Sequence, residues 1–110
     1  MRALVIGTDK YRHNQPLKNA VKDARAFGAK IESKGGTVVY ALDCKTSELK
    51  AKIEEYLSLL RENDVAMLYF AGHSCEYNNA LRLMAISEGD ESNIQTDAVN
   101  LLVLINKLVP

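Results

Sequence analysis

One short segment of the 110-residue chain, Gly72-His73-Ser74-Cys75, combines residue types that can carry out chemistry. It follows an apolar run over 65–70 that is typical of a buried strand. A histidine on a turn of small residues just past such a strand is firmly positioned and reaches solvent, which suits a general base. The simpler interpretation is one neutral, hydrogen-bonded imidazole on a loop. Its position in the sequence leaves both interpretations open.

Two other segments would end at the same edge of a parallel sheet, Gly7-Thr8-Asp9 and Asp43-Cys44. In open sheets of this kind, sites form beyond the carboxyl ends of the strands. A nucleotide loop is only weakly indicated, because neither G-x-G-x-x-G nor G-K-[ST] occurs. The histidine and the two cysteines offer too few ligands with metal-binding spacing. We therefore expect no metal and no cofactor.

The elements that would position these segments alternate between strand and helix. Apolar and β-branched runs predict strands over 3–6, 37–42 and 65–70. Helical spacing of apolar residues predicts helices over 17–33 and from a cap at Thr46 or Ser47 to about residue 60. This alternation predicts an α/β fold whose mostly parallel sheet has the core order 2-1-3 and helices on both faces.

The remainder of the chain gives a weaker pattern. An extra strand is predicted over 81–86, a polar loop over 87–97 and a last helix over 97–108. The length fits a single domain over 1–110.

Composition excludes several classes of partner. Lys plus Arg number 14 and so do Asp plus Glu, and the two signs are interspersed, which argues against a nucleic-acid partner. No apolar run approaches the roughly 20 residues of a membrane helix, so we expect no membrane partner. Two cysteines form no disulfide framework, which favours a reducing, cytoplasmic location.

Three segments have a familiar sequence. They are the opening Ala3-Leu-Val-Ile-Gly7 with Tyr11 and 17–24, the segment 35–39, and Asp64-Val-Ala-Met-Leu-Tyr-Phe-Ala-Gly-His73. Over residues 2 to about 86 the chain resembles the caspase-like cysteine peptidases, most closely the metacaspase and paracaspase branch. The resemblance implies a caspase-like three-layer sandwich. It also implies hydrolysis of a peptide or protein substrate by a Cys–His dyad.

The resemblance assigns roles to two neighbouring residues. His73 would be the general base and acid, and the backbone N–H of Ser74 would help to bind the oxyanion. Family members usually have glycine after the histidine. A positive φ at this position would be strained for serine.

The resemblance also implies a substrate pocket. Asp23 matches an acid that helps to bind a substrate Arg or Lys in the basic-specific branch. Leu17 lies near the place where true caspases have an arginine for aspartate substrates. The alternative is that Asp23 is a solvated acid on a helix surface.

The family nucleophile is a cysteine at the end of a fourth core strand. The sequence ends at Pro110, so we expect a domain truncated before that strand and inactive as an isolated chain. Cys75 is too close to His73 on one turn to serve easily as a replacement. Cys44 would be about 10 Å from the histidine strand, two strand spacings away.

Three hypotheses remain. The first is an enzyme part with a preference for Arg or Lys, completed by a complementing C-terminal part. The second is a non-catalytic caspase-like interaction module whose unpaired edge recruits a partner, such as a second copy in a homodimer. The third is an unrelated α/β binding domain.

Overall fold

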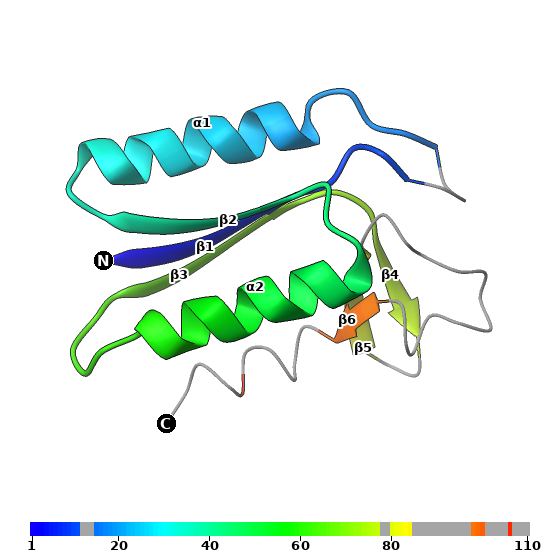
Figure 1. Cartoon of the computed structure of the whole chain (residues 1–110). Coiled ribbons are helices and arrows are strands. Elements are labelled where there is room, and N and C mark those ends of the chain that lie inside the picture. Colours follow the sequence, from blue (N-terminus) through cyan, green and yellow to red (C-terminus); the bar gives the residue numbers. More distant parts are fainter. Residues whose placement is uncertain (12–14, 78–79, 85–97, 101–105, 107–110) are drawn as a thin grey trace.

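The computed structural model describes residues 1–11, 15–77, 80–84, 98–100 and 106 of the chain. For 75–77, 80, 81, 84 and 98–100 it describes the backbone only. Figure 1 shows a sheet that is covered by a helix on each face, with a smaller sheet at one end.

The main sheet consists of β1 (Arg2–Gly7), β2 (Thr37–Leu42) and β3 (Ala66–Ala71). Its order is β2-β1-β3 and both pairings are parallel, as the sequence predicted. The central strand is paired without offset, because Gly7 lies opposite both Leu42 and Ala71. All three strands therefore end at one level, and the loops that follow them start from a common edge.

The two helices cover opposite faces of this sheet (Figure 1). Helix α1 (Ala20–Ser33) packs on one face of β1, and helix α2 (Thr46–Leu59) packs on the other. Because both faces of β1 are covered, its apolar residues are continuous and do not alternate with polar ones. The two core clusters are Ala3, Val5, Ala24 and Ile31 on the α1 side, and Leu4, Ile6, Val39, Ala41, Cys44, Leu49, Ile53, Tyr56 and Leu83 on the α2 side.

The start of each helix differs from the prediction. Helix α1 begins at Ala20 and not at residue 17, because the Asp9 carboxylate accepts the N–H groups of Ala20 and Val21 at 2.8 and 3.2 Å. The predicted cap at Thr46 or Ser47 is wrong. Lys45 is the N-cap, and its N–H donates to the Glu48 carboxylate at 3.0 Å.

A second, antiparallel sheet follows β3. It consists of β4 (Ser74–Tyr77), β5 (Ala80–Met84) and β6 (Ala98–Asn100), in that order. The extra strand predicted over 81–86 is β5, whereas β4 and β6 were missed. Ser-Cys-Glu-Tyr has little strand-like alternation, so pairing with β5 decides its structure.

The last predicted helix is partly wrong. Residues 98–100 form β6, because they pair with β5 in preference to following their helical spacing. Asn106 is helical, and the rest of 101–110 lies outside the described residues, as does the polar loop predicted over 87–97.

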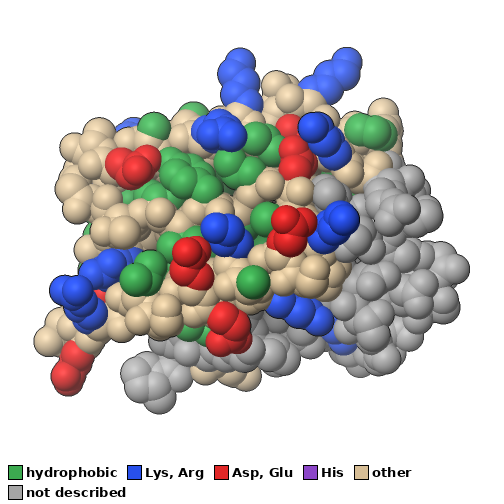
Figure 2. Space-filling view, viewed as in Figure 1, with side chains coloured by type: hydrophobic (Ala, Val, Ile, Leu, Met, Phe, Trp, Pro, Cys, Tyr) green, Lys and Arg blue, Asp and Glu red, His purple; other side chains and the backbone are tan. Residues whose placement is uncertain are grey.

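The surface view agrees with the even charge balance. Figure 2 shows one face on which Lys and Arg side chains alternate with Asp and Glu. Neither helix of the described part has the length and apolar character that a bilayer crossing requires.

Candidate functional site

The candidate site lies where β3 leaves the carboxyl edge of the main sheet. Ala71 ends β3 and accepts the N–H of Thr8 at 3.0 Å, so the loop after β1 runs directly beside Gly72 and His73. His73 is half-buried at this junction, between β3 and β4. The predicted placement of a histidine just past a strand of the sheet is therefore what the structure shows.

The His73 imidazole has a defined orientation. Its Nε2 lies 2.9 Å from the backbone carbonyl oxygen of Gln15. A carbonyl only accepts hydrogen bonds, so Nε2 carries the proton and, in the neutral ring, Nδ1 is the basic nitrogen. The geometry thus leaves one nitrogen available to take a proton from a reacting group.

Tyr11 contacts both the backbone and the ring of His73. The N–H of His73 donates to the Tyr11 hydroxyl oxygen at 2.7 Å, and the two ring centroids are 4.6 Å apart with a 59° tilt. A Cβ on Gly72 would lie 2.5 Å from the same hydroxyl oxygen, so this approach requires glycine. Tyr11 is buried, with 5% of its surface exposed. Its contact with His73 was missed.

The loop that carries Tyr11 and Gln15 is attached at both ends. Asp43 accepts the N–H groups of Asp9 and Lys10 at 2.8 and 3.2 Å. The carbonyl of Asp9 accepts the N–H groups of Tyr11 and Leu17 at 3.1 and 2.9 Å. Asp9 and Asp43 were predicted only to lie at this edge, and their role as loop supports has no clear signal in sequence.

Ser74 and Asp23 occupy this same end of the molecule. Ser74 is exposed and is the first residue of β4. Among the described residues other than glycine, only Asp43 and Asn63 have positive φ, so Ser74 escapes the strain expected of it. Asp23 is exposed in the first turn of α1, the turn that begins beside Asp9. The oxyanion and pocket roles stay predictions.

The two cysteines are in different environments. Cys44 is 8% exposed and part of the α2-side core, with its Sγ 3.8 Å from the carbonyl oxygen of Leu42. Burial raises the pKa of this thiol, and Glu48 adds to the shift, so the thiolate is disfavoured. Cys75 lies in β4 opposite Arg82, and its side chain is outside the described part.

Metal binding has no support in the described part. Within those residues, no group of three or more His, Cys, Asp or Glu side chains could enclose an ion. The chemistry available at this edge is that of an oriented imidazole beside backbone N–H groups.

Comparison with known proteins gives the same family as the sequence segments that resemble it. The chain is 32% identical over 74 residues to human mucosa-associated lymphoid tissue lymphoma translocation protein 1. These matched residues make up 67% of this chain. The matched region spans 9% of that relative's length. The sequence profile of the family described as the caspase domain matches residues 1–109. The predicted resemblance is therefore confirmed, and the chain belongs to the caspase domain family.

Proposed function

We propose that this chain is the histidine-bearing part of a caspase-like cysteine endopeptidase domain. The observation that carries this proposal is the imidazole of His73, whose Nε2 donates to the Gln15 carbonyl while Nδ1 is left as a base. A general base must have its free nitrogen directed by a bond to the other one. This arrangement supports the role that the family resemblance gave to His73.

The proposed reaction is acyl transfer. Nδ1 of His73 takes the proton of a cysteine thiol, and the thiolate attacks the substrate carbonyl carbon. The N–H of Ser74 donates to the oxyanion, and the imidazolium then protonates the leaving amine. Water cleaves the thioester with the same histidine as base, which restores the thiol.

The nucleophile of this proposal comes from outside the described edge. Cys44 is unsuited because it is buried and its raised pKa keeps it protonated. We propose that the cysteine is contributed by a further core strand beside β3, from a longer protein or a complementing part. Asp23, exposed at the start of α1, would favour Arg or Lys in the substrate.

The test is covalent labelling with a peptidyl-Arg chloromethyl ketone, followed by intact mass. Only an activated thiolate displaces the chloride at low reagent concentration. We expect labelling of the protein that contains this domain together with the cysteine strand, and none of the 110-residue chain alone. His73→Ala should abolish it, whereas His13→Ala, the other histidine of the sequence, should not.

Three further results test the histidine, the nucleophile and the substrate pocket separately. Labelling that survives His73→Ala would remove the histidine from the mechanism. Labelling of the isolated chain that is lost in Cys75→Ala would identify a local dyad. Asp23→Asn should weaken labelling by the Arg reagent more than by a matching Leu reagent, if the acid lines the pocket.

A non-catalytic interaction module is the second candidate. Among the described strands, β3 is at an edge of the main sheet, and the nearby Val65 is 62% exposed. An edge strand can pair with another chain. Sedimentation of the chain over a range of concentrations tests this candidate. A homodimer that forms through β3 should be lost in Leu68→Pro. It should be kept in the control variant Lys50→Ala.

A further inference from the structure

We infer that Tyr11 is a positioning residue for His73, acting through the backbone and the ring of the histidine. This inference rests on the proposed function, because only that function makes the histidine a catalytic residue. The two contacts that carry it are the 2.7 Å hydrogen bond from the His73 N–H and the ring contact at 4.6 Å.

The first step is that Tyr11 itself has little freedom. The residue is 5% exposed, and its N–H donates to the Asp9 carbonyl at 3.1 Å. Asp9 is attached in turn to Asp43 of the loop after β2 and to the first N–H groups of α1. The loop that carries the phenol is therefore held by the loop after β2 and by the start of α1.

The second step is that Tyr11 restricts His73 in two ways at once. Its hydroxyl fixes where the peptide group of His73 lies, and its ring limits rotation of the imidazole about χ1. An imidazole fixed in this way can keep Nε2 at the Gln15 carbonyl, which decides the tautomer. Small displacements of a base cost much of its effect, so this restriction bears on catalysis.

The third step is that glycine at the neighbouring position makes room for the same contact. Gly72 leaves room for the Tyr11 hydroxyl, since a Cβ there would lie 2.5 Å from that oxygen and 3.0 Å from Cζ of Phe70. Gly72 is not among the residues with positive φ. The absence of a side chain at Gly72 is thus a matter of space, and the space is occupied by Tyr11.

The chain offers a matched control at the other end of the sheet. Tyr56 is also buried, and its hydroxyl donates to the carbonyls of Arg2 and Met67 at 3.0 and 3.2 Å. Tyr56→Phe removes the same chemical group as Tyr11→Phe but far from His73 along the strands. Effects that come only from a weaker fold should appear in both variants.

The experiment is nuclear magnetic resonance of the 110-residue chain, with no substrate required. In Tyr11→Phe, exchange of the His73 amide hydrogen should become about tenfold faster, because its hydrogen bond is lost. The three-bond couplings that report χ1 of His73 should change from one rotamer to an average. Gly72→Ala, which displaces the phenol without removing it, should give the same two changes, and Tyr56→Phe should give neither.

Two results would overturn the inference. One is a folded Tyr11→Phe or Gly72→Ala variant with the amide exchange and χ1 couplings of His73 unchanged relative to Tyr56→Phe. The other, decisive if neither variant folds, is the absence of nuclear Overhauser effects between the two rings in the unaltered chain. Because these readouts need no cleavage, failure of peptide hydrolysis would count against the proposed function alone.

Discussion

At the amino end of the main sheet, the Tyr56 hydroxyl donates to two strand carbonyls, those of Arg2 and Met67. At the carboxyl end, the Tyr11 hydroxyl accepts the N–H of His73. Tyr56 belongs to the α2-side core, whereas Tyr11 belongs to neither of the core clusters that the described residues form. The same side chain thus joins two strands at one end and supports a loop histidine at the other.

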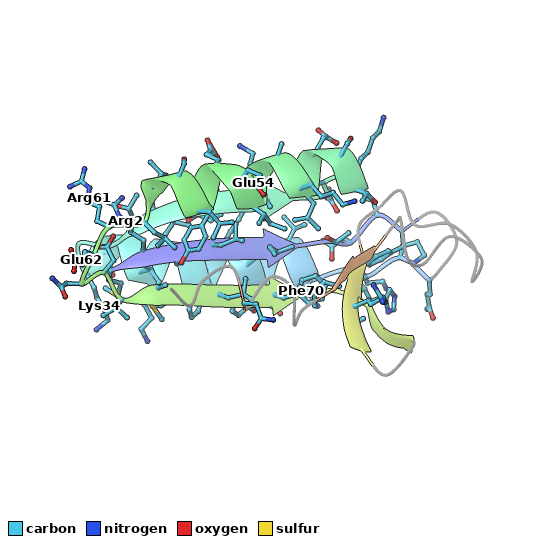
Figure 3. All side chains as sticks on the ribbon, turned by 90° about the horizontal axis from the view of Figure 1, so that it is seen from below. Arg2, Lys34, Glu54, Arg61, Glu62 and Phe70 are labelled. Atoms are coloured by element: carbon cyan, nitrogen blue, oxygen red, sulfur yellow. The ribbon has the colours of Figure 1, made fainter. Side chains whose placement is uncertain are left out.

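The carboxylates at the two ends of the main sheet also have different hydrogen-bond partners. Figure 3 shows Arg2, Arg61 and Glu62 at the amino end, with Phe70 toward the opposite end. At the amino end, the Asp64 carboxylate accepts hydrogen bonds from Arg2 Nε and from the Arg61 N–H, both at 2.8 Å. These contacts connect the start of β1 to the turn between α2 and β3. The carboxylates of the carboxyl end bind loop and helix N–H groups, which places the residues around His73.

The largest expected effect is a difference in stability between the alanine variants of the two tyrosines. Tyr56→Ala should lower the free energy of unfolding by about 3–5 kcal/mol, because a large buried side chain leaves a cavity in the core. Tyr11→Ala should cost clearly less, since its ring lies outside both clusters. Urea unfolding followed by circular dichroism measures both. Equal losses would mean that Tyr11 is as much a core residue as Tyr56.

A second test uses Asp43 and Asn63, the two residues other than glycine that have positive φ in the described part of the chain, one at each end of the sheet. Asp43 has φ 48° and Asn63 has φ 72°. Asp43→Gly should cost about 1–2 kcal/mol, because two loop N–H groups lose their acceptor despite the relieved backbone. Asn63→Gly should be neutral or slightly stabilising. Stability changes of the same sign and size would show that Asp43 supports nothing beyond its own turn.

A third test asks whether the carboxyl end is reactive throughout or only at His73. The Cys44 thiol should react with a disulfide reagent at pH 8 about tenfold more slowly in the folded chain than in urea, because it is buried and its pKa is raised. A Cys75→Ser background isolates this thiol. Rapid reaction in the folded state would return Cys44 to the candidate nucleophiles.

The same shift gives a pH dependence. A thiol whose pKa is higher in the folded state stabilises the fold below the unfolded value and loses that effect as pH rises. Stability should therefore fall above about pH 9, near the ordinary pKa of 9.0, and Cys44→Ala should flatten that fall. An unchanged slope would assign the fall to other groups.

The smallest effect concerns Asp64 at the amino end. The N–H of Arg61, followed by Arg2, lowers the pKa of this carboxyl below its ordinary value of 3.8. Its contribution is present above pH 3.8 and is lost as pH falls through the lower, folded value. Asp64→Asn should make acid unfolding less steep, with little change at neutral pH. Glu62→Gln serves as the control on the same exposed turn.

The main sheet could be predicted because the residue pattern of β1 indicates directly that the strand is buried on both faces. An apolar run with no alternation means that both faces are covered, and the helical stripes of α1 and α2 are what cover them. The small sheet could not be predicted in the same way. Ala98–Asn100 pairs with β5 across a long stretch of chain, and such pairing overrides local spacing.

The candidate site was predictable in position but not in construction. His73 was found because it follows a strand directly, which fixes its place at the edge. Its partners Tyr11 and Gln15 come from the loop after β1, and no spacing rule reports that this loop folds back beside β3. Gly72 before the histidine was the available signal, since a residue without a side chain often marks a close approach.

The placement of β1 in the centre of its sheet has a consequence for synthesis. Arg2–Gly7 leaves the ribosome before β3, yet Ala66–Ala71 of β3 is one of its two partners. At about 5–20 residues per second, this buried central strand waits several seconds with an unpaired edge. Nascent chains that stall before β3 would expose an apolar strand with an unpaired edge. Such chains should therefore need chaperones during translation more than a fold whose first strand lies at the edge of its sheet.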